Sequence, residues 1–148
     1  MRLAQARLVT KDVPALARFY EEVLGIAPIG SEDYVELRGL GGTLAISSKR
    51  SVDLFGAGAA EAAANRSVIL DFQVTDVDKE RYRLHGLIGE CVLEPTDQPW
   101  GSRSMLFRDP DGNLINFFAP AASAAGREEF RAHSLTLLKK RREEKLRN

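Results

Sequence analysis

Cysteine and histidine are scarce in this chain of 148 residues, which has one cysteine, Cys91, and two histidines, His85 and His133. A single cysteine excludes an internal disulfide and fits a reducing compartment. No histidine stands beside Cys91, so we expect a small buried hydrophobe there rather than a nucleophile. His85 lies near the end of an expected helix and His133 lies in the C-terminal tail, so both are predicted to be surface residues.

Long hydrophobic runs and a net charge are also lacking. The apolar run at Ser67 to Leu70 is far shorter than the ~20 residues of a membrane-spanning helix, and Met1 to Arg7 has no apolar signal-peptide region. These absences predict a cytoplasmic protein with no membrane partner. Basic and acidic residues number 21 each, yet residues 127–148 carry eight Lys/Arg and four Glu. We interpret this basic tail as a solvated helix face, which argues against a nucleic-acid partner; contact with an acidic protein surface is the alternative.

Two stretches of the chain repeat the same order of elements. Residues 4–10 alternate as a strand, Asp12 is placed as a helix N-cap, and apolar residues at helical spacing run to Leu24, where Gly25 ends the helix. Strands are expected over 34–37 and 43–47. From Ser67, SVILDFQVTDVDKERYRLHGL repeats the order of strand, aspartate cap, valine, helix and glycine. Further strands are then expected over 90–96, 103–108 and 114–118.

The period of about 65 residues is too long for a solenoid unit. We therefore predict an α+β fold of two βαβββ modules, over about 1–50 and 67–120. An alanine- and glycine-rich connector over about 51–66, with a short helix at 59–64, joins them. A helical C-terminal extension is expected over 121–148. The sequence DPDGN, from Asp109, predicts a tight turn that needs no functional role.

Two motifs carry a resemblance to a known family. LVTKDVPALARFYEEVLGI, from Leu8, and QPWGSRSMLFRDPDGNLINFF, from Gln98, resemble the vicinal oxygen chelate superfamily, which includes glyoxalase I, extradiol dioxygenases and bleomycin resistance proteins. The resemblance implies a glyoxalase/bleomycin resistance-like domain over 1–120, whose two modules curl into an incomplete barrel around a cavity. It does not imply one activity, because this scaffold hosts several chemistries.

The resemblance also implies four positions at which metal-dependent members place their ligands. These positions fall at Gln5, Ala45, Ile69 and Asn116. Two of them are apolar and two are neutral amides, whereas a catalytic divalent ion takes about three ligands of imidazole, thiolate or carboxylate character. We therefore predict a cavity with no metal and no cofactor, in which Asn116 is a pocket-lining amide.

Period-two alternation divides each expected strand into an apolar face beneath a helix and an opposite, polar face. The apolar set is Ala6, Leu8, Val35, Leu37, Leu44, Ile46, Val68, Leu70, Phe72, Val74, Met105, Phe107, Ile115 and Phe117. The opposite set, expected to line the concave side, is Gln5, Arg7, Tyr34, Glu36, Thr43, Ser47, Asp71, Gln73, Ser104, Leu106, Asn116 and Phe118. A small barrel without a ligand is filled by apolar side chains. The polar lining thus predicts a wet groove that holds a small molecule.

Trp100 lies in the segment QPWG, just before the expected strand over 103–108. Bleomycin resistance proteins carry a similar segment whose tryptophan helps to hold the planar rings of the drug, although a core or interface role suits a tryptophan equally well. A flat aromatic side chain at the mouth of a groove stacks on planar or cationic ligands. Arg103 nearby is expected to form a structural salt bridge.

Together these features predict stoichiometric capture of a planar or cationic small molecule by a metal-free homodimer of the bleomycin resistance type, a class linked to antibiotic resistance. The candidate ligand-binding residues are Trp100, Glu36, Asp71, Tyr34, Gln73, Arg7, Asn116 and Gln5, and no catalytic residue is assigned. The alternative is a glyoxalase-like lyase or dioxygenase. Such an enzyme is either metal-dependent or uses Glu36 or Asp71 as a general base, if burial raises the pKa of that carboxyl toward neutrality.

Overall fold

The computed structural model describes residues 1–122 and, in the C-terminal extension, Glu128, Ala132, Leu135, Thr136, Lys139, Lys140, 142–144, Leu146 and Arg147. The described residues form an α+β fold with two four-stranded sheets and no closed barrel, as predicted. From Glu128 on, the described positions of the extension are helical, whereas Arg127, the predicted helix start, and His133 lie outside the described residues. None of the helices described is both long enough and apolar enough for a membrane span.

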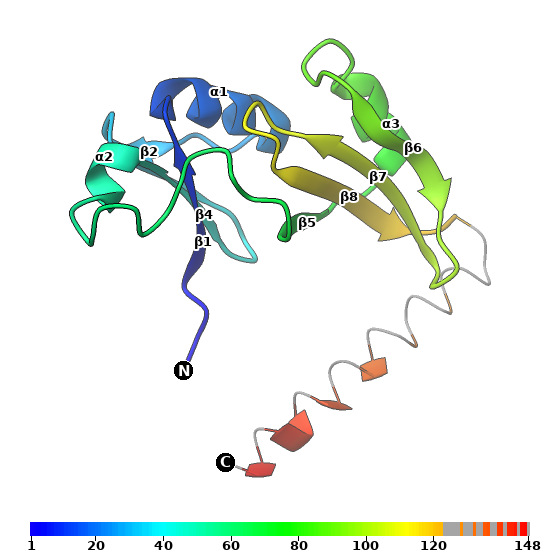
Figure 1. Cartoon of the computed structure of the whole chain (residues 1–148). Helices are drawn as coiled ribbons and strands as arrows, with labels where there is room; N and C mark the ends of the chain where they lie inside the picture. The colour runs from blue at the N-terminus through cyan, green and yellow to red at the C-terminus, as the bar shows by residue number, and fades with distance from the viewer. Residues whose placement is uncertain are drawn as a thin grey trace. The chain divides into compact units, whose positions relative to one another are not determined.

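The first sheet has the strand order β1 (Gln5–Thr10), β4 (Thr43–Ser48), β3 (Tyr34–Arg38) and β2 (Ile29–Gly30). β1 pairs with β4 in parallel, and the other neighbours are antiparallel. The helix α1 (Val13–Leu24) follows β1 and the short helix α2 (Lys49–Val52) follows β4 (Figure 1). The order strand, helix and three strands is therefore present in the first half of the chain, including the two-residue strand β2, which the sequence analysis missed.

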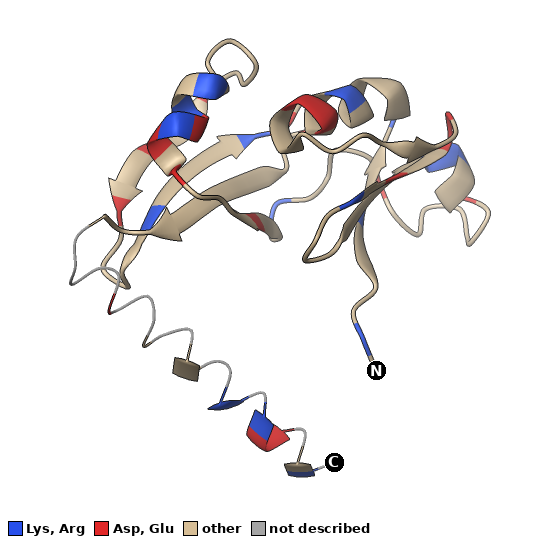
Figure 2. Ribbon diagram, turned by 180° about the vertical axis from the view of Figure 1, so that it is seen from behind, with Lys and Arg blue, Asp and Glu red and all other residues tan. Residues whose placement is uncertain are grey.

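The second sheet repeats this arrangement with the order β5 (Ile69–Gln73), β8 (Leu114–Pro120), β7 (Ser102–Arg108) and β6 (Cys91–Asp97). The helix α3 (Val77–Arg83) follows β5, and the side chain of its N-cap, Asp76, accepts a hydrogen bond from the Lys79 backbone N–H at 3.1 Å. Acidic and basic side chains are interspersed on α3 (Figure 2). Arg81 pairs with Glu94 of β6 at 2.7 Å, so an ion pair links the helix to the sheet.

The helix α1 forms where the sequence predicts it, and for the predicted reasons. Asp12 Oδ1 accepts a hydrogen bond from the Ala15 backbone N–H at 3.0 Å, and Gly25 ends the helix with φ at +67°, a conformation that glycine adopts without steric cost. The buried residues of α1 recur at helical spacing, and the helix contacts β3 and β4. The facing side chains are also buried, namely Leu8, Val35, Leu37, Leu44 and Ile46.

Burial in the second sheet agrees with the predicted apolar face at most positions. Leu70, Met105, Phe107, Ile115 and Phe117 are buried, and the rings of Phe107 and Phe117 pack edge to face with centroids 5.2 Å apart. Phe72 and Val74 are half-buried. Val68 is wrong as a member of this face, because it precedes β5 and is 52% exposed. Ala6, in the first sheet, is likewise exposed.

The chain divides into two compact units that do not follow the sequence repeat strictly. One unit comprises Met1–Leu70, Gly86–Gly89 and Arg108–Leu114, and the other comprises Asp71–His85, Glu90–Phe107 and Ile115–Asn148. The tight turn predicted at DPDGN is present in the first unit. The Asp109 N–H donates to the Asn113 carbonyl at 3.0 Å, and Gly112 has φ at +85°.

The connector contains no helix over 59–64, which corrects the prediction. Six residues are too few for a stable isolated helix, and Ala63 has a positive φ of 56°, which a right-handed helix does not allow. Instead, the side chain of Asn65 organises the end of the connector. Its Oδ1 accepts from the backbone N–H groups of Ser67 and Val68, and its Nδ2 donates to Asn113 Oδ1 at 3.0 Å.

Candidate functional site

Four of the predicted ligand-binding residues lie on one face of the first sheet. In the strand register, Arg7 pairs with Ala45 of β4, and Ala45 pairs with Glu36 of β3. Gln5 and Tyr34 belong to the neighbouring rows of the same face, because side chains on a strand alternate with period two. This face is opposite to the one that packs against α1. The two faces of the first sheet were thus assigned correctly from the sequence.

Hydrogen bonds connect three of these side chains into a chain across the sheet. The Gln5 Nε2 amide donates to the Tyr34 hydroxyl at 3.0 Å, and that hydroxyl donates to Glu36 Oε1 at 2.8 Å. The other oxygen of Glu36 forms an ion pair with Arg38 Nε at 2.7 Å. The phenol is therefore held at both its donor and its acceptor sites.

Arg7 is held differently, by two aromatic rings. The carbon atom of its guanidinium lies 5.4 Å from the centroid of the Tyr34 ring and 5.5 Å from that of the Phe55 ring. Both distances are within the range of cation–π attraction, which orients the planar guanidinium against the ring faces. Phe55 belongs to the turn after α2, where its backbone N–H donates to the Val52 carbonyl at 2.9 Å.

The ring of Tyr34 crosses β4 above Ala45. Tyr34 pairs with Ser47, yet its hydroxyl reaches Gln5, which pairs with Thr43, four residues away on β4. The ring therefore spans the row of Ala45, and Ala45 is fully buried. We therefore expect a larger side chain at residue 45 to displace the ring.

The surroundings of Glu36 determine its protonation state. The hydrogen bond from Tyr34, followed by that from Arg38, lowers the pKa of the Glu36 carboxyl below its ordinary value. The carboxylate is thus ionised near neutral pH and is a weaker proton acceptor than an isolated carboxylate. This direction is opposite to the raised pKa that the general-base alternative requires of Glu36.

The other four candidates are Asp71, Gln73 and Asn116 on the second sheet and Trp100 in a turn next to it. The Asn116 Nδ2 amide of β8 donates to Asp71 Oδ1 of β5 at 2.9 Å. Gln73 follows on β5 and is exposed. Trp100, in the turn between β6 and β7, is 56% exposed, so it is not a core residue of its unit. Arg103, as expected, forms structural salt bridges, at 2.7 Å to Asp78 and 3.1 Å to Asp97.

The four positions implied for metal ligands do not fit a catalytic dication. Ala45 is buried beneath Tyr34, and Ile69 is half-exposed with no donor atom. The amide nitrogens of Gln5 and Asn116 donate to Tyr34 and Asp71, and the Asn116 Oδ1, buried with no hydrogen-bond partner among the described residues, is a neutral oxygen. A catalytic ion requires anionic or imidazole ligands. Within residues 1–122 and the other described positions, no group of three or more His, Cys, Asp or Glu side chains is placed to hold an ion.

Cys91 and His85 take up the structural positions expected of them. Cys91 is half-buried on β6, and its thiol donates to the Leu93 carbonyl at 3.2 Å. Burial, followed by the charge of Glu94, raises the pKa of this thiol, so the nucleophilic thiolate is disfavoured. His85 is exposed. Neither residue is part of the polar face of the first sheet.

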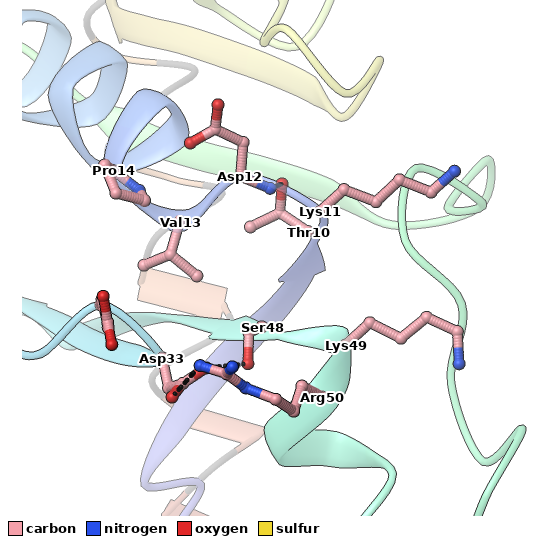
Figure 3. A pocket seen from close by; sticks show the side chains of 10 residues that line it. Thr10, Lys11, Asp12, Val13, Pro14, Asp33, Ser48, Lys49 and Arg50 are labelled. Carbon is pink, nitrogen blue, oxygen red and sulfur yellow. Dashed lines mark hydrogen bonds and ion pairs between the residues drawn. The ribbon is translucent and has the colours of Figure 1, made fainter.

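A separate hollow of about 440 Å³ lies where β1 leads into α1 (Figure 3). Its lining residues are Thr10, Lys11, Asp12, Val13, Pro14, Glu32, Asp33, Ser48, Lys49 and Arg50. Asp33 accepts hydrogen bonds from Ser48 Oγ at 2.7 Å and from both Arg50 Nη2 and Nε, and these bonds lower its pKa. This paired carboxylate joins the segment before β3 to α2, which is a structural role.

Two residues of the polar cluster were missed in the sequence analysis. Arg38 continues the period-two series of Tyr34 and Glu36. It was missed because the expected strand ended one residue earlier, at Leu37. Phe55 lies in the connector, which has no periodicity. An isolated aromatic residue among glycine and alanine was its only signal, and such a signal does not identify a contact with β1.

Comparison with known proteins identifies the family. The model of the Glyoxalase/Bleomycin resistance protein/Dioxygenase superfamily matches residues 2–117. The chain belongs to this superfamily. It is 31% identical over 125 residues to a protein of Bacillus subtilis (strain 168) described as "Uncharacterized protein YraH", covering 80% of this chain and 98% of the relative.

Solved structures of the superfamily have the same fold. A glyoxalase/bleomycin resistance protein/dioxygenase from Nocardioides has a TM-score of 0.69 at 24% identity, covering 84% of this chain and 86% of its own. A family enzyme from Burkholderia phytofirmans PsJN has a TM-score of 0.74 at 17% identity, covering 82% of this chain and all of its own. At these identities the similarity shows the fold alone, so the activity has to be argued from the site.

Proposed function

We propose that this superfamily member is a small-molecule-binding protein that works without a metal ion and captures a planar or cationic ligand on its polar sheet faces. The observation that carries the proposal is the cluster of Gln5, Arg7, Tyr34 and Glu36 on the face opposite to α1. Polar groups that converge on an open sheet face, instead of an apolar filling, are typical of a binding site.

Capture without a metal is supported by what stands at the ligand positions of the family. The Tyr34 ring occupies the space above Ala45, where metal-dependent relatives are expected to place a ligand. The Nδ2 of Asn116 donates to Asp71, so this side chain offers an ion only one neutral amide oxygen, which is a weak ligand for a catalytic dication. Asp71 can bind an organic cation while it accepts the bond from Asn116, because a carboxylate has several acceptor sites.

The remaining candidate residues complete the proposal. We expect Trp100, exposed in the turn before β7, to stack on a flat ligand, and Gln73 to contribute a polar contact. We also propose that the protein acts as a homodimer in the cytoplasm, and that protection against a toxic small molecule, as in antibiotic resistance, is the benefit of capture.

Metal content and ligand binding together test this proposal. Purified protein is expected to contain less than about a tenth of an equivalent of Zn, Ni, Fe or Mn, against a full equivalent for an occupied catalytic site. A thermal-shift screen of planar and cationic compounds should give saturable stabilisation, as binding to the folded state requires. A stoichiometric metal, together with chelator-sensitive turnover of the methylglyoxal–glutathione adduct, contradicts the proposal and favours a glyoxalase.

A further inference from the structure

We propose that the Arg7 guanidinium is a carboxylate anchor, and that the captured small molecule is a planar organic acid. The inference rests on the proposed function and deepens it by naming the class of ligand. Its starting point is the position of Arg7 between the rings of Tyr34 and Phe55.

Among the described residues, the charged group of Arg7 has no protein acceptor. A guanidinium has five N–H donors, and none of them is paired with an acceptor or a carboxylate in the part of the chain that the structure describes. Two other arginines of the same unit are paired, Arg38 with Glu36 and Arg50 with Asp33. Glu36 is bonded to Tyr34 and Arg38, and no hydrogen bond or ion pair joins it to Arg7 in the described part of the chain.

With the two rings in place, the guanidinium is suited to bind a carboxylate. Both rings lie within cation–π distance of the guanidinium carbon and accept no hydrogen bond from it, so its N–H donors stay available to an acceptor. A carboxylate that approaches in the plane of the guanidinium accepts two parallel N–H bonds, which are charge-assisted and geometrically selective. Because the rings hold the guanidinium in place before binding, less side-chain entropy is lost on complex formation.

The exposed ring of Phe55 indicates that the acid is planar. Its side chain is 76% exposed although one side of the ring lies against Arg7. The turn that carries it is fixed by the hydrogen bond to the carbonyl of Val52, which is itself buried. An exposed ring beside a cation offers apolar surface for a second aromatic ring. A molecule with a flat ring and a carboxylate therefore satisfies Phe55 and Arg7 together.

Three probes with the same naphthalene ring test the inference: 2-naphthoate, 2-naphthamide and 2-naphthylmethylammonium. Their affinities are measured by calorimetry on the full chain and on three variants, Arg7→Gln, Phe55→Leu and Arg18→Gln. Arg18 is the matched control, because it is an exposed arginine of α1 in the same unit, away from the polar face. Circular dichroism and thermal melting establish that each variant is folded.

Wild-type protein is expected to bind 2-naphthoate about 10- to 100-fold more tightly than 2-naphthamide, the range for a charge-assisted hydrogen bond. The Arg7→Gln variant should lose this preference, and Phe55→Leu should weaken 2-naphthoate several-fold. The Arg18→Gln variant should behave like the wild type. Rising salt should weaken 2-naphthoate and leave 2-naphthamide unaffected.

Equal or tighter binding of 2-naphthamide or of the ammonium probe to the wild type overturns the inference and leaves metal-free capture standing. A preference for 2-naphthoate that survives in Arg7→Gln overturns the assignment to Arg7. If Arg7→Gln does not fold, the preference of the wild type, its salt dependence and the weaker binding of 2-naphthoate to Phe55→Leu decide. Failure of 2-naphthoate to bind at millimolar concentration also overturns the inference, and with a negative ligand screen it overturns the proposed function as well.

Discussion

The hydroxyl of Tyr20 donates a 2.7 Å hydrogen bond to Oδ2 of Asp109, 89 positions farther along the chain, and both residues are buried. Asp109 also accepts from the backbone N–H groups of Asp111 and Asn113 and from the Asn113 side chain. This carboxylate thus holds the turn between β7 and β8 together and ties it to α1. Burial and the neighbouring carboxylate raise the pKa of Tyr20, so the phenol stays protonated and remains a donor.

Replacement of Tyr20 by Phe should therefore destabilise the fold. The variant leaves a buried carboxylate short of one donor, which costs about 1–3 kcal/mol. Urea denaturation measures the loss. The control is Tyr82→Phe, since Tyr82 is 87% exposed on α3 and its change is expected within about 0.5 kcal/mol. Equal stability of the two variants would mean that the bond to Asp109 contributes nothing.

Ala45→Glu tests the position of the Tyr34 ring. A larger side chain at residue 45 has no space beneath the ring, so overpacking by about 1–3 kcal/mol is expected. If the ring is the obstacle, the second change Tyr34→Ala should recover part of the loss. Denaturation of the two single variants and of the double variant gives their coupling, expected at about 0.5–3 kcal/mol. If the free-energy changes of the two substitutions are strictly additive, the Tyr34 ring is not what obstructs a larger side chain at residue 45.

Acid should remove the stabilising contribution of Glu36. Its pKa is lowered in the folded state, so the contribution is present above the ordinary value of about 4.5 and is lost as the pH falls through the folded-state value. Glu36→Gln should be less stable than the wild type at pH 7, and the two should converge once the pH has fallen below the folded-state pKa of Glu36. Denaturation from pH 7 to pH 3 measures this. Glu61→Gln, in the connector, should differ little from the wild type at any pH, and a constant gap for Glu36→Gln would contradict the pKa direction.

Trp100→Ala should weaken ligand binding without unfolding the protein. Trp100 is the one tryptophan of the sequence, and it is 56% exposed, so truncation removes little buried area. Intrinsic tryptophan fluorescence should be quenched by any flat ligand that stacks on it, and Trp100→Phe should retain most of the affinity. Unchanged binding by Trp100→Ala would remove Trp100 from the proposed site.

Local patterns were sufficient to predict most of the fold and one face of the site. Asp12 and Gly25 delimit α1 because capping depends on neighbouring backbone groups. Gln5, Arg7 and Glu36 share a face because strand alternation is fixed by geometry. The direction of the pKa shift of Glu36 was not predictable, because it depends on where the phenol of Tyr34 points. The contact of Phe55 with Arg7 joins residues 48 positions apart through a connector without periodicity, and no local rule specifies it.

The side chain of Asn65 fixes the C-terminal end of the connector, so the two ends of the connector are held independently of each other. The start of β5 takes its position from the bonds of this one amide to Ser67, Val68 and Asn113, and Phe55 takes its position from the turn after α2. The stretch between these two fixed points can therefore be lengthened or cut without shifting either sheet, at an entropic cost that grows only slowly with length. An epitope tag or a reporter peptide inserted there should be tolerated, which makes this segment the natural place to label the protein while its polar face stays intact.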